Sequence, residues 1–384
     1  MSCVFKKLLL VFIFTPLLVR AWILSEPEQV IPADNLPSEV VCQKANNNLD
    51  LAFYQNRLFL AFRTAPFHFA SPKTHLYIIS SPDWGKTWEF EAEVFLGTDM
   101  REPRFLVLNN KLFFYFFEAG KNPLAFTPKH IYAMERIKQG KWTEPVKVFK
   151  PGCVLWRAKT RNGTAYATVY CGGAGEYTGE NAQIEIYFLT TEDGYHFQPV
   201  DPAHPVVARG GSETAFEFDR EGNLYAVIRN EGGDGKTWGG KICRADKSRL
   251  ALWECKPTPY KYDSPLLFRH QDQIYLIARR NLDGEFDKGK RWLADPIETL
   301  YYLARYWWTK KRTALYQLDT KKLEVNWLFD LPGKGDTAFP ALVPLNEKQY
   351  LIYNYTSPLS GKDPCWMKGQ LKPTIIYSII LSEN

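Results

Sequence analysis

Short apolar runs of strand length alternate with turn residues along most of the chain, and residues 212–230 show this pattern most clearly. Apolar and polar positions alternate over 215–218, residues 219–223 (Asp-Arg-Glu-Gly-Asn) are typical of a tight turn, and 224–228 is a continuous apolar run. The pattern predicts a β-hairpin with Glu213 at its start and Arg229 at its end. Because a hairpin returns to the edge where it began, we expect these two charges to lie close together.

The second strand of this hairpin has counterparts along the whole chain, each preceded by turn residues. The six runs are 58–63, 112–117, 165–170, 224–229, 274–279 and 350–355, and they end on Arg63, Phe117, Tyr170, Arg229, Arg279 and Tyr355. A second hairpin follows each of the first five, with an aromatic residue near its end: Trp88, Trp142, Phe197, Trp253 and Trp327. Two hairpins make a four-stranded blade, and such repeats are typical of propellers. The predicted fold class is therefore all-β, a six-bladed β-propeller.

The sixth unit is incomplete as a blade. It has only one outer strand, at 374–381, before the sequence ends. An N-terminal strand at 29–32 is the predicted partner that closes the ring of sheets. A propeller closed in this way leaves only short strand edges exposed.

One insertion in the fifth unit, residues 282–312, departs from the strand pattern. Asp295 is a candidate N-cap, Pro296 would take the first helical position, and Glu298 follows three residues after the cap. Basic residues at 310–312 suit the C-terminal end of a helix. We expect a short helix with an apolar face that packs on the rim of the ring, formed by Leu300, Tyr301, Ala304 and Trp308. Alternatively, the aromatic residues at 301, 302 and 306–308 shape a glycan subsite or a lid.

The N-terminus has the features of an export signal. Lys6 and Lys7 precede an apolar run at 8–19, and Ala21 stands at a suitable cleavage position. The run is short for a membrane span, and the rest of the sequence contains no longer one. We expect residues 1–21 to be a signal peptide and 22–384 to be the propeller, with an uncleaved N-terminal anchor as the alternative.

Six cysteines remain in 22–384, an even number that permits disulfides in an exported chain. Within single units, Cys153 can pair with Cys171 and Cys243 with Cys255. Cys42 and Cys365 flank the proposed ring closure, so a third disulfide is expected there. The cysteine spacings match no zinc pattern, and the sequence indicates neither a metal nor a cofactor.

Composition narrows the range of partners. With 45% apolar and 15% aromatic residues, the chain can bury a large core. Its formal net charge of +6 is spread along the sequence, so no dense basic run indicates nucleic acid. The same positive excess favours an anionic substrate.

A sharper motif lies in the first unit at 81–88, with the sequence Ser-Pro-Asp-Trp-Gly-Lys-Thr-Trp. Asp83 can cap the backbone of a tight turn, Gly85 can adopt the positive φ that the turn needs, and Trp88 can pack between neighbouring sheets. A weaker version occupies 191–197 in the third unit. These motifs predict structural roles.

The motif at 81–88 resembles the Asp box of the sialidase (neuraminidase) superfamily, whose members are six-bladed propellers. The order of residues at the strand ends is also similar to that family. The resemblance implies that Arg63, Arg229 and Arg279 bind the carboxylate of a sialic acid. It further implies that Tyr355 is the nucleophile and Glu213 its base.

The chemistry of an acidic sugar suits these residue types. Three guanidinium groups bind a carboxylate at several points, which lysines cannot reproduce. A neutral phenol approaches an anomeric carbon that bears a carboxylate without the repulsion that a carboxylate nucleophile would meet. Since a phenol has a pKa near 10, it needs a base such as Glu213. Tyr353 and Tyr377 are alternatives to Tyr355, and Arg280 is an alternative to Arg279 in strand register.

The sequence departs from the family at the general acid. Sialidases carry an aspartic acid between the first arginine and the first Asp box, whereas 64–80 contains neither Asp nor Glu. His68 and His75 are the titratable residues there. Asp99 opens the second unit, and it is expected either to replace the acid or to contact the sugar. Five further side chains are expected near the same end of the ring: Arg101, Arg157, Trp156, Asp263 and Asp336. Of these, Arg101 and Arg157 are candidates for binding the substrate.

The sequence as a whole predicts an exported, sialidase-like glycoside hydrolase that releases a terminal acidic sugar. Two other functions stay open. One is a glycan-binding propeller that keeps the arginines without turnover, and the other is a glycosidase that uses two carboxylates such as Asp99 and Glu213.

Overall fold

The structure is a computed structural model that describes residues 21–122, 126–173, 184–230, 234 and 237–384. The expected signal peptide therefore lies outside the described residues, apart from its last residue, Ala21. Within the described part, no helix is long and apolar enough to cross a membrane.

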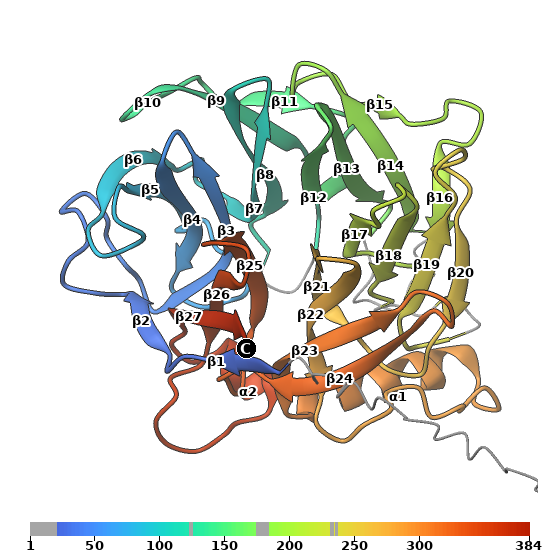
Figure 1. Ribbon diagram of the computed structural model, residues 1–384. Helices are drawn as coiled ribbons and strands as arrows, with labels where there is room; N and C mark the ends of the chain where they lie inside the picture. Colours follow the sequence, from blue (N-terminus) through green and yellow to red (C-terminus); the bar gives the residue numbers. More distant parts are fainter. Residues whose placement is uncertain (1–20, 123–125, 174–183, 231–233, 235–236) are drawn as a thin grey trace, which may run out of the picture.

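Six antiparallel sheets are arranged as the blades of a propeller, and each begins with the strand at the centre of the ring (Figure 1). Blade 1 contains β3 (Ala45–Tyr54), β4 (Arg57–Ala65), β5 (His75–Ser81) and β6 (Glu89–Val94). Blade 2 contains β7 (Asp99–Leu108), β8 (Lys111–Gly120), β9 (Ile131–Lys138), β10 (Lys141–Trp142) and β11 (Val146–Val148). Blade 3 contains β12 (Cys153–Arg161), β13 (Thr164–Cys171), β14 (Glu185–Thr191), β15 (Gln198–Pro199) and β16 (Val206–Arg209).

The second half of the ring follows the same plan. Blade 4 contains β17 (Thr214–Phe218), β18 (Leu224–Ile228), β19 (Lys241–Ala245) and β20 (Glu254–Pro257). Blade 5 contains β21 (Asp263–His270), β22 (Gln273–Asn281), β23 (Lys311–Asp319) and β24 (Glu324–Asp330). Blade 6 contains β25 (Ala338–Pro344), β26 (Gln349–Thr356) and β27 (Ile375–Glu383). The predicted six-bladed, all-β fold is thus confirmed.

The ring closes through the N-terminal residues, as the sequence predicts. Strand β2 (Glu28–Ile31) pairs with β27, and Gln29 faces Tyr377. A strand that was not predicted, β1 (Trp22–Leu24), pairs with the far end of β27, where Trp22 faces Glu383. Both ends of the chain therefore contribute to blade 6.

The inner strands of five blades share one irregularity. The register shifts within β3, β7, β12, β21 and β25. Four residues at these β-bulges have a positive φ although they are not glycine: Asn48 (41°), Glu102 (53°), Ser264 (48°) and Phe339 (57°). A bulge redirects one side chain and is frequent beside functional sites. These bulges turn an extra side chain toward one end of the ring.

The turn at 81–88 has the predicted structural role. Asp83 accepts hydrogen bonds from the backbone N–H (2.9 Å) and the hydroxyl (2.8 Å) of Thr87, and these bonds lower the pKa of its carboxyl to about 2. Gly85 has a φ of +96°, and a Cβ added there would lie 2.6 Å from the hydroxyl oxygen of Tyr353. Trp88 is buried in a core shared by blades 1 and 6. The turn therefore joins the first and last blades.

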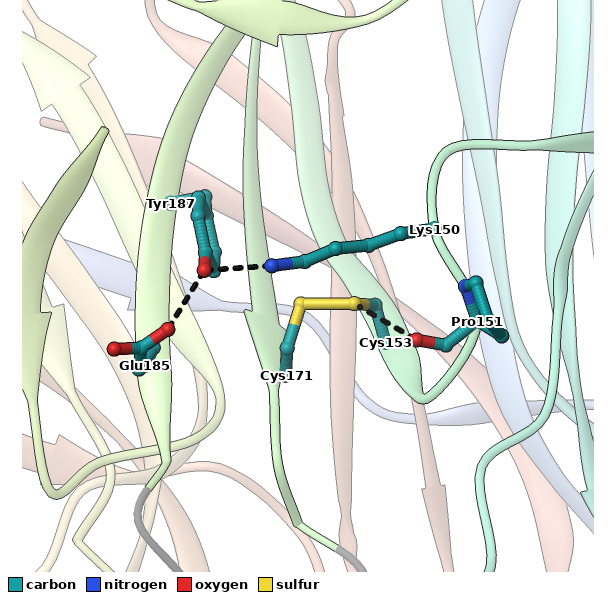
Figure 2. Close-up of a disulfide and its surroundings, with 6 residues drawn as sticks. All are labelled: Lys150, Pro151, Cys153, Cys171, Glu185 and Tyr187. Carbon is teal, nitrogen blue, oxygen red and sulfur yellow. Dashed lines mark hydrogen bonds between the residues drawn. A yellow bond between two sulfur atoms is a disulfide. The ribbon is translucent and has the colours of Figure 1, made fainter. Parts of the chain in front are cut away.

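Two of the three expected disulfides are present among the described residues. Cys153–Cys171 links facing residues of β12 and β13, and Cys243–Cys255 links facing residues of β19 and β20. Beside the first disulfide, Lys150 donates to the hydroxyl of Tyr187 (Figure 2). Such bonds fit a chain that folds in an oxidising compartment.

The expected disulfide between Cys42 and Cys365 is wrong, because both are free thiols in the described structure. Burial raises the pKa of the Cys42 thiol to about 11. The proximity of two segments to the ring closure did not bring their cysteines together. The closure therefore depends on strand pairing.

The insertion in blade 5 forms the expected helix, α1 (Asp295–Trp308), between β22 and β23. Its N-cap is Ala294 rather than Asp295. The expected buried face is also wrong, since Leu300 is 64% and Trp308 is 61% exposed. The face of Tyr302, Leu303 and Tyr306 is buried instead. A second, short helix that was not predicted, α2 (Trp366–Gln370), lies beside α1.

Candidate functional site

A cavity of about 460 Å³ opens at the end of the ring toward which the bulges point. All six blades line it, and three of the four residues at the bulges, Asn48, Glu102 and Ser264, bring polar groups. Helices α1 and α2 add Trp307, Trp366, Met367 and Gln370 to its wall. A larger pocket of about 680 Å³ lies against β16 of blade 3 and β18, β19 and β20 of blade 4, and its lining includes none of the predicted site residues.

Three arginines line the cavity: Arg101, Arg229 and Arg279. The last two are predicted residues of the carboxylate-binding set, and they come from neighbouring blades. Arg280 lies outside the cavity wall and pairs with Asp330 at 2.7 Å. Arg280, the alternative to Arg279 in strand register, is therefore not part of the cavity wall.

The hydroxyl of Tyr306, on α1, joins Arg229 and Arg279 at one point. Arg279 donates to it at 2.6 Å and Arg229 at 3.4 Å. The same hydroxyl donates to Asp263 at 2.9 Å. Asp263 in turn lies 3.2 Å from the guanidinium of Arg229 and 3.6 Å from that of Arg279. The inserted helix thus fixes the orientation of both arginines from behind the cavity wall.

Tyr306 is surrounded by basic side chains. The side-chain nitrogens of Lys311 and Lys261 lie 3.9 and 4.9 Å from the centre of its ring. Burial holds the pKa of Lys311 well below its ordinary value. Burial alone would raise the pKa of Asp263, but the neighbouring Arg229, Lys261 and Arg279 lower it. On this side of the cavity, two arginine guanidinium groups therefore lie beside one carboxylate, and this excess of positive charge favours a bound anion.

Arg63 is fully buried and lies outside the cavity wall. Its guanidinium donates to Asp99 at 2.6 Å and to the carbonyl of Phe69 at 3.1 Å. The same carboxylate accepts a hydrogen bond from Arg101 at 2.5 Å. Arg63 therefore orients Arg101 through Asp99, and Arg101 is the arginine that reaches the cavity in this part of the ring.

These contacts make Asp99 unsuitable as a general acid, contrary to one expectation from the sequence. Burial alone would raise the pKa of Asp99, but Arg101, Arg63 and a hydrogen bond from Thr74 hold it below its ordinary value. Its side chain is inaccessible to solvent. A buried carboxylate held by two arginines has no proton to donate and no path to a sugar.

Arg157 is also displaced from the predicted position. Its guanidinium donates to the backbone carbonyls of Pro265 (3.1 Å) and Pro340 (3.2 Å) in blades 5 and 6. Burial, together with the nearby Arg104, lowers its pKa to about 9. Arg157 thus crosses the centre of the ring, and Trp156 beside it is fully buried.

Tyr355 lines the cavity, and its hydroxyl donates to Asp336 at 2.9 Å. The other carboxylate oxygen of Asp336 lies 2.6 Å from Nδ1 of His68, which also lines the cavity. Burial raises the pKa of Tyr355 well above its ordinary value, so the resting phenol is protonated. Burial alone would raise the pKa of Asp336 too, but His68 and Arg279 lower it. The phenol of Tyr355, the ionised carboxylate of Asp336 and the imidazole of His68 are therefore connected in one series of contacts.

Tyr355 is paired with Asp336 and not with Glu213, the partner expected from the sequence. Glu213 accepts hydrogen bonds from Arg229 at 2.6 Å and from the backbone N–H of Ser264 at 2.5 Å. Tyr353, by contrast, faces Gly85, and Tyr377 donates to the carbonyl of Pro332. Of the three candidate tyrosines, Tyr355 is the one in the cavity wall.

Glu102 is a cavity residue that the sequence interpretation missed. It is 7% exposed, and its hydrogen bonds from Asn48 and Arg104 are both long, at 3.4 Å. Burial, with the nearby Glu213, raises the pKa of its carboxyl to about 8, although Arg104 opposes the shift. Glu102 is therefore protonated at neutral pH while Glu213 accepts two hydrogen bonds.

This shift predicts how stability depends on pH. The pKa of Glu102 in the folded protein, about 8, lies above its ordinary value of 4.5. The contribution of Glu102 to the free energy of unfolding is therefore complete below pH 4.5 and is lost as the pH rises toward 8. Replacing Glu102 with Gln removes the ionisable group. We expect the variant to gain free energy of unfolding relative to wild type by about 1.4 kcal/mol per pH unit across this window. Urea unfolding at several pH values measures the difference, and parallel curves for the two proteins would contradict it.

The bulges explain why Glu102 was missed. In a regular strand, the side chain of Glu102 would lie on the opposite face of the sheet from the one it occupies. One signal was available, since Pro103, Pro265 and Pro340 each follow a bulge residue that lines the cavity. Proline within a strand marks an edge or a bulge. The role of Tyr306 had no comparable signal, because it depends on how α1 packs.

Comparisons with known proteins were made by sequence and by structure. No protein-family profile and no curated protein matches the sequence. Among solved structures, Trypanosoma rangeli sialidase aligns over 94% of this chain at 12% identity, with a TM-score of 0.62. A Hadza microbial sialidase aligns over 87% at 12% identity, with a TM-score of 0.53. The fold is that of the sialidases.

A third similar structure, a protein of unknown function from Dyadobacter fermentans, aligns over 90% of this chain and 98% of its own at 16% identity, with a TM-score of 0.59. This chain spans 59% and 65% of the two sialidases. At such identities the likeness establishes the sialidase-type propeller alone. Among the described residues, no group of three or more His, Cys, Asp or Glu side chains is placed to hold a metal ion.

Proposed function

We propose that the protein is a sialidase-like glycoside hydrolase that removes a terminal acidic sugar. The observation that carries this proposal is that Arg229, Arg279 and the hydroxyl-bearing Tyr355 line one cavity. A volume of about 460 Å³ is in the range of small-ligand sites and suits one sugar residue. A similar structure, Trypanosoma rangeli sialidase, has been solved with sialic acid bound.

In this proposal the two arginines bind the carboxylate of the sugar. Their guanidinium groups converge at the hydroxyl of Tyr306, so they are already oriented before the sugar arrives. A pre-oriented guanidinium loses little conformational entropy on binding. Arg101, held by Asp99, supplies a third positive charge in the cavity wall.

The reaction would proceed in two steps. The phenol oxygen of Tyr355 attacks the anomeric carbon, its proton passes to Asp336, and the bond from that carbon to the leaving-group oxygen breaks. His68 holds Asp336 in position for this transfer. Water then attacks the same carbon and gives a proton to the carboxylate that protonated the leaving group, while the bond to the phenol oxygen breaks and the phenol regains its proton from Asp336. This order fits a nucleophile that is neutral at rest.

Glu102 is the proposed proton donor to the leaving group. It lines the cavity, and its pKa of about 8 keeps a proton available at neutral pH. Glu213 accepts a hydrogen bond from Arg229, and its carboxylate would stabilise the positive charge that develops on the sugar. Asp99, which the sequence suggested for the acid, serves instead to position Arg101.

A glycosidase that uses two carboxylates is the second candidate. Glu102 and Glu213 line the same cavity, interact electrostatically and differ in environment. Such pairs are typical of an acid and a nucleophile or base. In that mechanism Glu213, rather than Tyr355, would act on the anomeric carbon or on water.

Two assays of the purified protein test the proposal. Hydrolysis of a fluorogenic aryl sialoside and of a natural sialylated oligosaccharide is measured, and sialic-acid binding is measured separately by calorimetry. We expect cleavage of both substrates and binding of the acid. Binding without cleavage would indicate a lectin-like propeller, and neither binding nor cleavage would overturn the assignment of an acidic sugar.

A further inference from the structure

Helix α1 is apolar on two opposite faces. Its inner face packs Tyr302, Leu303 and Tyr306 into the protein. At 3.6 residues per turn, Ile297, Leu300, Ala304 and Trp308 share the other face. Ile297 is 58%, Leu300 64% and Trp308 61% exposed. A helix with two apolar faces is expected to be covered on both, yet only the inner one packs against the protein.

The exposure is concentrated in this part of the molecule. Among the described residues, the large hydrophobic side chains with more than 55% exposure are Val41, Ile137, Trp292, Ile297, Leu300, Trp308 and Leu371. Trp292 precedes α1 in the same insertion, and Leu371 directly follows α2, which lies beside α1. Five of these seven therefore belong to the two helices and their flanking residues. Apolar patches of this kind mark sites of interaction with proteins or membranes.

The same segments have more basic than acidic residues. Residues 282–312 contain seven Lys or Arg against five Asp or Glu, and 359–373 contain three against one. These two segments thus carry a formal net charge of +4. Lys288, Lys368 and Lys372 are exposed, and Lys290 lies 5.6 Å from the ring of Trp292. Tryptophan, aliphatic side chains and lysine in combination are typical of helices that lie in the interface of a membrane.

The charge of these segments favours a membrane over a second copy of the chain. Ile297, Leu300, Trp308 and Trp292 together expose on the order of 500 Å². Each partner of a stable protein dimer buries about 800 Å², of which a little over half is apolar, so the apolar area fits either occupant. Two copies of one positively charged face would repel each other, whereas anionic lipid headgroups attract each nearby lysine in addition to the apolar contact.

The position of the helices connects this surface with the cavity. Trp307 of α1 and Trp366 of α2 line the cavity on the inner side of the same two helices. Both helices lie at one side of the ring, next to blades 5 and 6 (Figure 1). A surface docked on the outer face of α1 would therefore lie close to the cavity.

We propose that the outer face of α1, defined by Ile297, Leu300, Ala304 and Trp308, docks on a lipid bilayer that contains anionic lipids. The lysines of the two segments meet the headgroups, and the apolar side chains enter the interface. It follows, on the basis of the proposed function, that the substrate is an acidic sugar on a membrane-borne glycan. The docking itself does not depend on catalysis.

Co-sedimentation with lipid vesicles tests the docking in the absence of any sialoside. Vesicles of equimolar phosphatidylcholine and phosphatidylserine are compared with vesicles of phosphatidylcholine alone. We expect binding to the first that weakens with added salt. The triple variant Ile297→Ser, Leu300→Ser, Trp308→Ser should bind about 100-fold more weakly, because its interface loses three large apolar side chains.

The variant Ile137→Ser is the matched control, since Ile137 is 56% exposed but belongs to β9 in blade 2. It should bind the vesicles as wild type does.

A second variant, Lys288→Glu with Lys290→Glu, should reduce binding to the anionic vesicles without touching the apolar face. Failure of the wild-type protein to bind either vesicle overturns the proposal. Sedimentation that reveals a dimer in wild type and a monomer in the triple variant would also overturn it, and would assign the face to a second copy of the chain. Neither result would affect the aryl sialoside assay.

Discussion

Replacing Tyr355 with Phe is expected to lower turnover by on the order of 10⁴-fold and to leave sialic-acid binding nearly unchanged. In the proposed mechanism the phenol oxygen forms the bond to the sugar, so the variant has no nucleophile at this position. The two arginines do not depend on it, because Tyr306 and Asp263 hold them. Turnover is measured on the aryl sialoside and binding by calorimetry.

Tyr353→Phe is the matched control for this experiment. Tyr353 is buried on the same strand, and its hydroxyl lies beside Gly85 rather than in the cavity. It should retain activity even if its stability falls slightly. Full activity in Tyr355→Phe would exclude the phenol as nucleophile and would favour a mechanism based on Glu102 and Glu213. Equal loss in both variants would indicate that the hydroxyl groups act through folding.

Replacing Arg279 with Ala should weaken the binding of sialic acid about 100-fold or more. A multidentate, charge-assisted contact is lost, and the buried carboxylates of Asp263 and Asp336 lose a compensating positive charge. Removing one partner of a buried ion pair also costs about 3–5 kcal/mol of stability. Binding must therefore be measured by calorimetry on protein whose folding has been checked by circular dichroism.

Arg280→Ala provides the control for this second experiment, because the adjacent guanidinium pairs with Asp330 outside the cavity wall. It should bind sialic acid as wild type does. Arg279→Lys should lie between the two, since lysine keeps the charge and loses the forked geometry. Unchanged affinity in folded Arg279→Ala would refute the proposed binding mode.

The sequence was sufficient for the fold because each blade repeats the same pattern of hydrophobic strand and polar turn. Ring closure through Gln29–Ile31 and the disulfides Cys153–Cys171 and Cys243–Cys255 were also predictable, since they follow from the order of the repeats. The face of α1 could not be predicted in the same way. A helix that is apolar on two opposite faces gives no indication of which face packs inward.

The residue types of the site were predictable from the sequence, whereas the side chains with which these residues pair were less predictable. Arg229, Arg279, Glu213 and Tyr355 all line the cavity, as a common strand register suggested. The pairing of Tyr355 with Asp336 depends on contacts between residues distant in sequence. Similarly, Arg63 was expected in the cavity, but its side chain is held below the surface by Asp99 and two backbone carbonyls.

The completion of blade 6 from both ends of the chain has a consequence for folding kinetics. Ser25 bonds to Ile380 across 355 residues of sequence, and β1 and β2 both pair with β27. Contacts of such high sequence separation form late, because the entropy of closing the loop must be overcome first. During synthesis on the ribosome, blades 1 to 5 can form while the ring is still open. The two edges of that opening are then exposed, so the interval before β27 emerges is the stage at which chaperones would protect the chain from aggregation.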